Sequence, residues 1–177
     1  MTSPHSFSHD GVGRDGSPDR KDPSKAGPTT PGARARAGGG GASLPLVKLR
    51  GLPPLVRAAL RRRGIATCAQ LLRVAGRAGD RARLAREAGV PPETLLALVL
   101  RADLARVDGV GAVFGLMLED LGIRDVQALA TQEAGELHAR LHAHNREERL
   151  ARRSPTPEEV RDWVEQARGL PEFITYG

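Results

Sequence analysis

Two glycines at the start of an expected helix are the residues in this sequence best suited to binding a ligand. Gly109 and Gly111 flank Val110, and apolar residues precede and follow them at the spacing of packed helices. Two glycines allow a tight turn, and they let the backbone approach another surface because no Cβ intervenes. The second glycine leads into a helix whose first amides lack partners and whose dipole is positive at this end. The chemistry expected here is the binding of an anion such as phosphate.

The glycine turn occurs twice because the chain contains an internal repeat. At an offset of 58 residues Gly51 aligns with Gly109, and further on, at an offset of 65, Pro92 aligns with Pro157. The seven additional residues of the second copy are expected near the polar stretch at 145–155. The repeat predicts two copies of one helical unit, in which a helix over 92–107 closes the first copy and opens the second. We expect neither copy to be stable alone.

The two copies differ in their turns and in their charge. Pro53 stands where the second copy has Gly111, and Pro54 follows it, so two N–H donors are missing from the first turn. Residues 44–101 carry 12 basic and 3 acidic side chains, net +9, whereas residues 102–177 carry 9 and 14, net −5. Because phosphate binding depends mainly on cations, we expect affinity to come from the first copy, with the second turn as a weaker contact. The candidate binding residues are Lys48, Arg50, Gly51, Arg57, Arg61, Arg62, Arg63, Gly109, Val110 and Gly111.

These candidates also have simpler interpretations. Arg57 and Arg61 lie one helical turn apart, opposite the face of Leu55 and Ala59, so we expect them to point outward, as a solvated helix face also would. The glycines are equally explained as a structural turn between two packed helices. The opposite charges of the two copies fit a protein-interaction adaptor that self-associates or docks on a charged partner. The residues alone therefore leave DNA, structured RNA and protein open as partners.

The segment from Leu104 to Leu118 resembles the helix-hairpin-helix motif, with apolar residues, two turn glycines and the small residue Gly115 at that motif's spacing. In proteins with this motif the turn amides hold a DNA phosphate, and paired motifs contact both strands across the minor groove without reading bases. Residues 44–170 resemble an uncharacterised bacterial family of tandem helix-hairpin-helix proteins, a domain of unknown function. That resemblance also rests on short matching stretches, which are Arg-Gly-Ile at 63–65, Ala-Asp-Leu at 102–104 and Leu-Gly-Ile at 121–123. It implies this fold and, by analogy, sequence-independent binding to double-stranded DNA.

Beyond residue 43 the apolar residues recur at three- and four-residue spacing, which predicts an all-α fold. Thr67 with Gln70 and Thr156 with Glu159 are capping-box pairs, which mark two helix starts. Four glycines follow apolar segments where a left-handed residue ends a helix, and they are Gly64, Gly89, Gly122 and Gly169. The expected helices are 45–50, 54–63, 68–76, 80–88, 92–107, 112–121, 125–130, 132–144 and 157–168. The helix at 92–107 is apolar on all sides at its centre, so we expect it to run through the core.

The predicted organisation is a disordered tail over 1–43, a folded domain over 44–170 and a C-terminal extension over 171–177. The tail is rich in Gly and Pro and has few large apolar residues, so it cannot offset the entropy of ordering. It is interpreted as a linker, with a weakly basic nucleic-acid-seeking arm as the alternative. The longest apolar run, Leu95 to Leu100, is too short to span a membrane, and no secretory leader is recognisable. We therefore expect a cytoplasmic protein, and the role of Phe173–Tyr176 stays open.

Several residues with reactive side chains are interpreted as structural. A single cysteine excludes a disulfide scaffold, and Cys68 is expected to be a small buried residue rather than a thiol with a lowered pKa. His138, His142 and His144 are interpreted as a polar helix face rather than a zinc site, because no partner residues accompany them. Trp163 follows the apolar register and is expected in the core. No catalytic constellation is present, so we expect no enzymatic activity, cofactor or metal.

Overall fold

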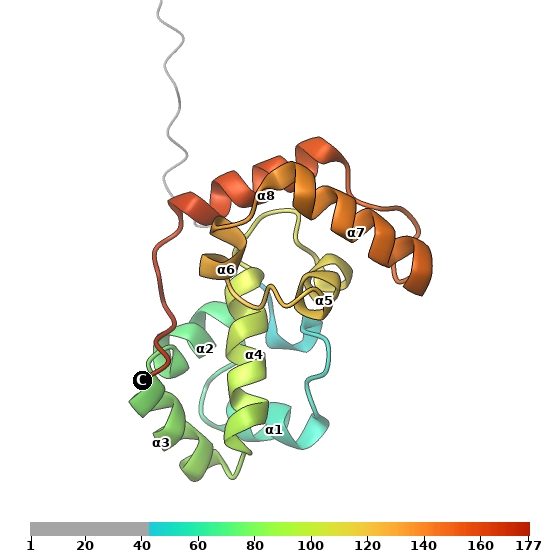
Figure 1. Cartoon of the computed structure of the whole chain (residues 1–177). Coiled ribbons are helices and arrows are strands. Elements are labelled where there is room, and N and C mark those ends of the chain that lie inside the picture. Colours follow the sequence, from blue (N-terminus) through green and yellow to red (C-terminus); the bar gives the residue numbers. More distant parts are fainter. Residues whose placement is uncertain (1–42) are drawn as a thin grey trace, which may run out of the picture. The chain divides into compact units, whose positions relative to one another are not determined.

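The computed structural model describes residues 43–177, which belong to one compact unit extending over Gly40–Gly177. The described chain is all-helical, as predicted (Figure 1). Its elements are the short 3-10 turn η1 (Leu46–Lys48) and the helices α1 (Pro54–Arg62), α2 (Cys68–Ala75), α3 (Ala78–Ala88), α4 (Pro92–Leu104), α5 (Ala112–Asp120), α6 (Val126–Ala130), α7 (Ala134–Glu148) and α8 (Pro157–Gly169). The prediction of a disordered tail concerns residues that lie outside the described part, apart from Ser43.

The local signals in the sequence fix most helix ends. Both capping boxes are present, with the side chains of Thr67 and Thr156 accepting hydrogen bonds from the third residue of α2 and of α8. The glycines that end α1, α3 and α5 have the left-handed backbone that was predicted, with φ between 63° and 83°. The prediction for Gly169 is wrong, because α8 continues through this residue and its backbone is not left-handed. There the chain leaves the helix at Leu170 in an extended conformation, so no left-handed residue is needed.

Three predicted helices differ from the observed ones by three residues or more, and the helix predicted at 80–88 begins two residues earlier, at Ala78. The predicted helix at 45–50 is only the turn η1, because Leu49 already has an extended backbone. The predicted helix at 92–107 ends at Leu104, where a tight turn places both Leu104 and Val107 in the second hydrophobic core. The predicted helix at 132–144 begins two residues later, because the Glu133 side chain caps it, and it continues to Glu148.

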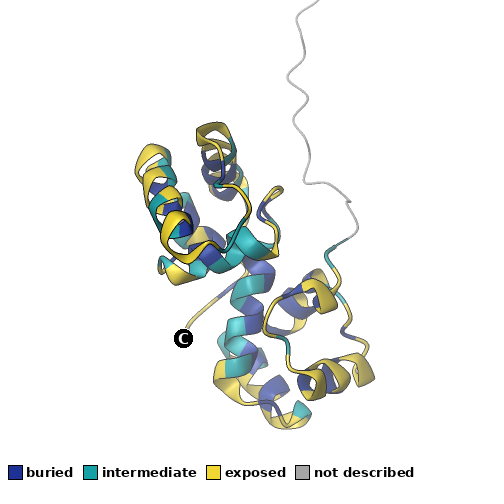
Figure 2. Ribbon diagram, turned by 90° about the vertical axis from the view of Figure 1, so that its right-hand side faces the viewer, coloured by how far each residue is buried: buried dark blue, intermediate teal, exposed yellow. Residues whose placement is uncertain are grey.

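The helices surround two hydrophobic cores (Figure 2). The first core is built by η1 and α1 to α4 and the second by the residues from Leu104 to α8. Below we call residues 44–103 the first half and residues 104–170 the second half. The central helix α4 packs against α2 and α3 along its buried side (Figure 1), while its last residue, Leu104, belongs to the second core. Trp163 is 2% exposed in the second core, which confirms its predicted place.

The residues after α8, which we call the C-terminal strap (171–177), return to the first half (Figure 1). Ile174 is 3% exposed and belongs to the first core. The Thr175 N–H donates to the Gly76 carbonyl (3.1 Å), and the Thr175 hydroxyl accepts from the first amide of α3 (3.2 Å). The buried Arg81 guanidinium donates to the Thr175 carbonyl and to the carbonyls of Ala75 and Gly76 at the negative end of α2. The strap is therefore an integral part of the first half.

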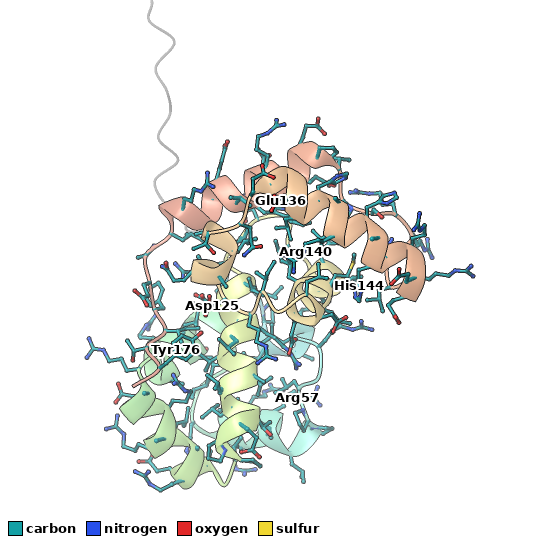
Figure 3. The ribbon with its side chains drawn as sticks, in the orientation of Figure 1. Arg57, Asp125, Glu136, Arg140, His144 and Tyr176 are labelled. Carbon is teal, nitrogen blue, oxygen red and sulfur yellow. The ribbon has the colours of Figure 1, made fainter. Side chains whose placement is uncertain are left out.

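The strap also contacts the second half. The Tyr176 hydroxyl donates to the Asp125 carboxylate, and both residues are labelled in Figure 3. Asp125 at the same time caps α6 by accepting from the Ala128 amide (2.7 Å). Burial and this carboxylate raise the pKa of Tyr176, so the phenol stays neutral and donates. The strap thus joins the α2–α3 corner to the start of α6.

Candidate nucleic-acid interface

The glycine turn of the second half has the geometry that its sequence predicts. Gly109 has a φ of 89°, which side chains rarely adopt, and Val110 is 7% exposed in the second core. Gly111 is the N-cap of α5 with an extended backbone, and its N–H donates to the Gly109 carbonyl (3.0 Å). Both glycines are exposed. Val110 therefore anchors the turn while its two glycines remain at the surface.

The first amides of α5 are available to a ligand. No acceptor among the described residues receives the N–H groups of Ala112, Val113 and Phe114, and Gly111 provides no capping side chain. Four other helices differ in this respect, because a Thr, Asp or Glu side chain caps α2, α6, α7 and α8. The uncapped amides and the positive end of the helix dipole favour an anion at the start of α5.

The start of α1 presents fewer free amides than the start of α5, as the two prolines predict. Gly51 has a φ of 69°, and the chain then passes through Pro53, the N-cap of α1, and Pro54, its first residue. Neither proline has an N–H group. Among the described residues the only free amides at this helix start are those of Leu55 and Val56.

Each turn is held by the last helix of its own half. In the first half Arg101 of α4 donates through Nη1 to the Arg50 carbonyl (2.9 Å). In the second half the Gln166 amide of α8 accepts from the Asp108 N–H (2.8 Å) and donates to the Asp108 carbonyl (3.2 Å). Arg101 and Gln166 are 65 residues apart, which is the offset of the sequence repeat in this region. In each half, therefore, a side chain of the last helix forms a hydrogen bond to the backbone of the residue that precedes the first turn glycine.

The glycines that begin the two turns face these last helices rather than a ligand. A Cβ on Gly51 would lie 2.5 Å from Arg101 Nη1, and one on Gly109 would lie 2.8 Å from Trp163 Nε1. A Cβ on Gly111 would meet no atom within 4 Å. Of the three turn glycines, only Gly111 leaves open space for a surface to approach.

The predicted cations are at the surface. Lys48, Arg50, Arg57, Arg61, Arg62 and Arg63 are all exposed, and none forms an ion pair with a described residue. Within the described part of the chain, Arg63 alone among them donates a side-chain hydrogen bond, to the Glu87 carbonyl. Arg57 is labelled on α1 in Figure 3. The prediction that Leu55 lies with Ala59 on the buried face of α1 is wrong, because Leu55 is 85% exposed. The buried residues of α1 are Val56, Ala59 and Leu60.

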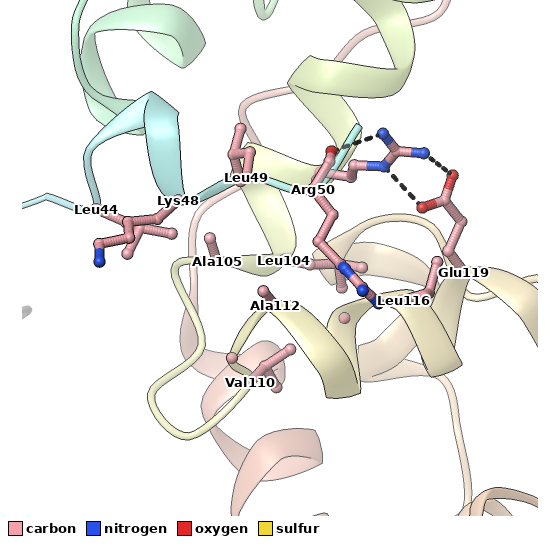
Figure 4. Close-up of a pocket in the computed structure, with 13 residues that line it drawn as sticks. Leu44, Lys48, Leu49, Arg50, Leu104, Ala105, Val110, Ala112, Leu116 and Glu119 are labelled. Atoms are coloured by element: carbon pink, nitrogen blue, oxygen red, sulfur yellow. Dashed lines mark hydrogen bonds and ion pairs between the residues drawn. The ribbon is translucent and has the colours of Figure 1, made fainter. Parts of the chain in front are cut away.

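The two halves meet in a groove that joins part of the predicted site (Figure 4). Lys48 and Arg50 of the first half line it together with Gly111 and Ala112 at the start of α5. In Figure 4 the side chain of Arg50 extends toward Leu116 of α5. The arginines of α1, which are Arg57, Arg61 and Arg62, do not line this groove.

Two charged residues of the groove, Arg101 and Glu119, were missing from the prediction. Arg101 binds Glu119 of α5 through two hydrogen bonds, Nε to Oε2 (2.8 Å) and Nη2 to Oε1 (2.9 Å). This contact raises the pKa of Arg101, so its charge is permanent. A signal was present in the sequence, because Glu119 aligns with Arg61 and Arg101 with Gln166. In each of these two pairs the charge of the side chain differs between the two copies of the repeat.

The other reactive side chains have structural roles. Cys68 is buried, as predicted, and burial raises the pKa of its thiol to about 11, so the alternative of a lowered pKa is wrong. His144 Nε2 lies 3.1 Å from Asp120 Oδ2, which links α7 to α5. Arg140, labelled beside His144 in Figure 3, donates to the Leu121 carbonyl (2.8 Å). No helix in the described part is long and apolar enough to cross a bilayer.

Comparison with known proteins places this chain in a family. The model of the family described as a domain of unknown function (DUF4332) matches residues 50–170. The chain belongs to this family. The match begins at the residue before the first glycine turn and ends just after α8, so it contains both turns, the second core and most of the first core. No curated protein and no solved structure matches the chain.

Proposed function

We propose that this member of the DUF4332 family is a non-catalytic module of two tandem helix-hairpin-helix repeats that binds the backbone of double-stranded DNA without sequence choice. The observation that carries the proposal is the state of the cations on α1. Arg57, Arg61 and Arg62 are exposed and form no ion pair with any described residue. Their charges are thus available to phosphates, and each phosphate that a protein neutralises releases bound counterions.

The assignment of two repeats is supported by positions that match across the halves. Gly51 and Gly109 both have a positive φ, and Leu60 and Leu118 are both fully buried at the same offset. The helices after the two turns, α1 and α5, also begin and end 58 residues apart. Together with the shared bond from the last helix to the turn, these matches support two copies of one folded unit.

The groove between the halves supports a second contact with DNA. It places Lys48 and Arg50 beside Gly111 and the uncapped amides of α5. Asp108 lies next to this turn and is exposed, so its carboxylate weakens the local attraction for phosphate. We therefore assign most of the affinity to the first half and a smaller share to the second turn.

The test is a titration of the full chain against a labelled duplex of random sequence at several salt concentrations. A triple variant carrying Arg57→Gln, Arg61→Gln and Arg62→Gln removes three positive charges. If each arginine contacts one phosphate, the slope of log affinity against log salt becomes shallower by about 2.7, since each contact contributes about 0.9.

The matched control removes three other charges. Arg124, Arg146 and Arg152 are exposed residues of the second half without an ion pair to a described residue, so changing them to Gln alters the net charge equally. The control should leave the salt slope close to the wild-type value. Absence of binding at low salt, binding that is indifferent to salt, or equal effects of the two triple variants would each refute the proposal.

A second candidate function is a protein-interaction adaptor, and the exposed apolar residues of the first half favour it. Leu55 is 85% exposed at the start of α1, and Val47 is 57% exposed in η1. Under this hypothesis Leu55→Ser reduces self-association, measured by light scattering, and leaves duplex binding unchanged. A wild-type chain that is monomeric at all concentrations would remove the self-association form of the hypothesis.

A further inference from the structure

Arg101 of the first half donates three hydrogen bonds from one guanidinium group, and two of them cross to the second half. Two of these go to the Glu119 carboxylate of α5 and one to the Arg50 carbonyl of the first turn (Figure 4). The side chains of Arg101 and Glu119 are each 26% exposed, so water screens this pair less than it screens a fully exposed one. The two parallel hydrogen bonds also fix the orientation of the Arg101 side chain relative to Glu119, because the guanidinium group is planar. Arg101 thereby holds the first turn at a defined place against α5.

The repeat makes this contact more informative. The matching residue in the second half, Gln166, makes the same kind of bond to the turn backbone but is neutral. The residue that matches Glu119 in the first half is Arg61, which is exposed and forms no ion pair with a described residue. Both partners of the bridge therefore depart from the repeat, and they do so at the boundary between the halves.

The contact also controls a predicted binding residue. The Arg50 carbonyl accepts from Arg101, and the Arg50 side chain extends along the groove toward Leu116 of α5. Gly51 lies close to the same guanidinium group, since a Cβ there would lie 2.5 Å from Arg101 Nη1. The Arg101 guanidinium at the same time neutralises Glu119, which would otherwise repel a polyanion in this groove.

We propose that Arg101, acting with Glu119, is the positioning residue that holds Arg50 over α5, so that the two halves bind DNA as one surface. This inference rests on the proposed function. Arg101 itself is turned toward Glu119 and the backbone, so its effect on DNA passes through Arg50.

The repeat supplies the best test variant. Arg101→Gln installs the residue found at the matching position, which can still bond the turn backbone but cannot bridge to Glu119. Binding of the full chain to the random duplex is measured for Arg101→Gln, Arg50→Gln and the double variant. We expect each single variant to weaken binding by about threefold or more and to reduce the salt slope by about 1. The double variant should bind no more weakly than Arg50→Gln alone. If Arg101 acts on DNA only through Arg50, its substitution has no further effect once Arg50 is absent.

Two controls separate positioning from stability and from charge. Arg153→Gln removes another two-bond Arg–Glu pair, that of Arg153 with Glu159, with the same change in net charge but within the second half. It should change the affinity less than about twofold. Glu119→Gln breaks the bridge from the other side and should reproduce the shallower salt slope of Arg101→Gln. Urea unfolding of each variant reports any general loss of stability.

The outcomes distinguish the two proposals. If wild type does not bind the duplex, both the proposed function and this inference fail. If wild type binds but Arg101→Gln resembles Arg153→Gln, or if Arg50→Gln costs the same affinity with and without Arg101, only the positioning role is overturned. A loss of urea stability without a change in salt slope would likewise leave Arg101 with a structural role alone.

Discussion

The two glycines of the second turn should respond very differently to alanine, although only one residue separates them. Gly109 has a φ of 89°, and an added Cβ would lie 2.8 Å from Nε1 of the buried Trp163. The left-handed backbone costs an ordinary residue about 1–2 kcal/mol. Displacing a packed core residue costs about 1–3 kcal/mol more. We expect Gly109→Ala to lower the free energy of unfolding by about 2–5 kcal/mol.

Gly111→Ala is the matched variant, because Gly111 has a φ of −76° and open space around its Cβ position. Because alanine is a poorer N-cap than glycine, this variant should lower the stability by no more than about 1 kcal/mol. Gly64→Ala isolates the backbone cost, since Gly64 has a φ of 74° and no neighbouring atom within 4 Å, and should cost about 1–2 kcal/mol.

Urea unfolding followed by circular dichroism measures all three glycine variants, and the fluorescence of Trp163, the only tryptophan, reports its surroundings directly. The reasoning is refuted if Gly109→Ala is no less stable than Gly64→Ala, or if Gly111→Ala loses as much as either. The same set tests function: Gly111→Ala folds normally yet should weaken duplex binding, because its methyl group occupies the space open to a phosphate.

Three further predictions follow from the strap, the cysteine and the second capping box. Ile174→Ala should lower the free energy of unfolding by about 2–4 kcal/mol, because it empties a site in the first core. Phe173→Ala at a half-exposed position should cost less than Ile174→Ala, because it loses a cation–π contact worth about 0.5–1 kcal/mol and only part of the burial of its ring. With its pKa near 11, Cys68 should react with iodoacetamide at pH 8 at least about a hundredfold more slowly in the folded chain than in urea. The Arg153 guanidinium lowers the pKa of Glu159 from 4.5 to about 2, so this carboxylate stabilises the fold above pH 4.5 and loses its effect as the pH falls to about 2. Carboxyl titration by NMR should give that midpoint, and Arg153→Gln should raise it.

Much of the fold could be predicted because the helix starts depend on short-range chemistry. A Thr followed three residues later by Gln or Glu satisfies two amides locally, so Thr67 and Thr156 marked their helices without any knowledge of packing. The end of α4 was missed for the opposite reason. Its apolar sequence continues to Val107, and only the demand of the second core turns the chain at Leu104.

The sequence predicted individual residues of the candidate site, but it did not predict how the two halves bring them together. Exposure of Arg57 and Arg61 followed from the helical period. The groove between the halves depends on how α5 lies against the first turn, and no local pattern encodes that relation. The bridge from Arg101 to Glu119 connects residues 18 positions apart on different helices, and only their mismatch within the repeat pointed to it.

The strap has a consequence for how the protein is made. The first amide of α3 finds its acceptor in Thr175, 97 residues further along the chain, and Ile174 fills a site in the earlier of the two cores. A ribosome releases the N-terminal half of this domain long before it has synthesised these residues. The α2–α3 corner of the nascent first half therefore stays open to solvent until the ribosome has also made residues 171–177.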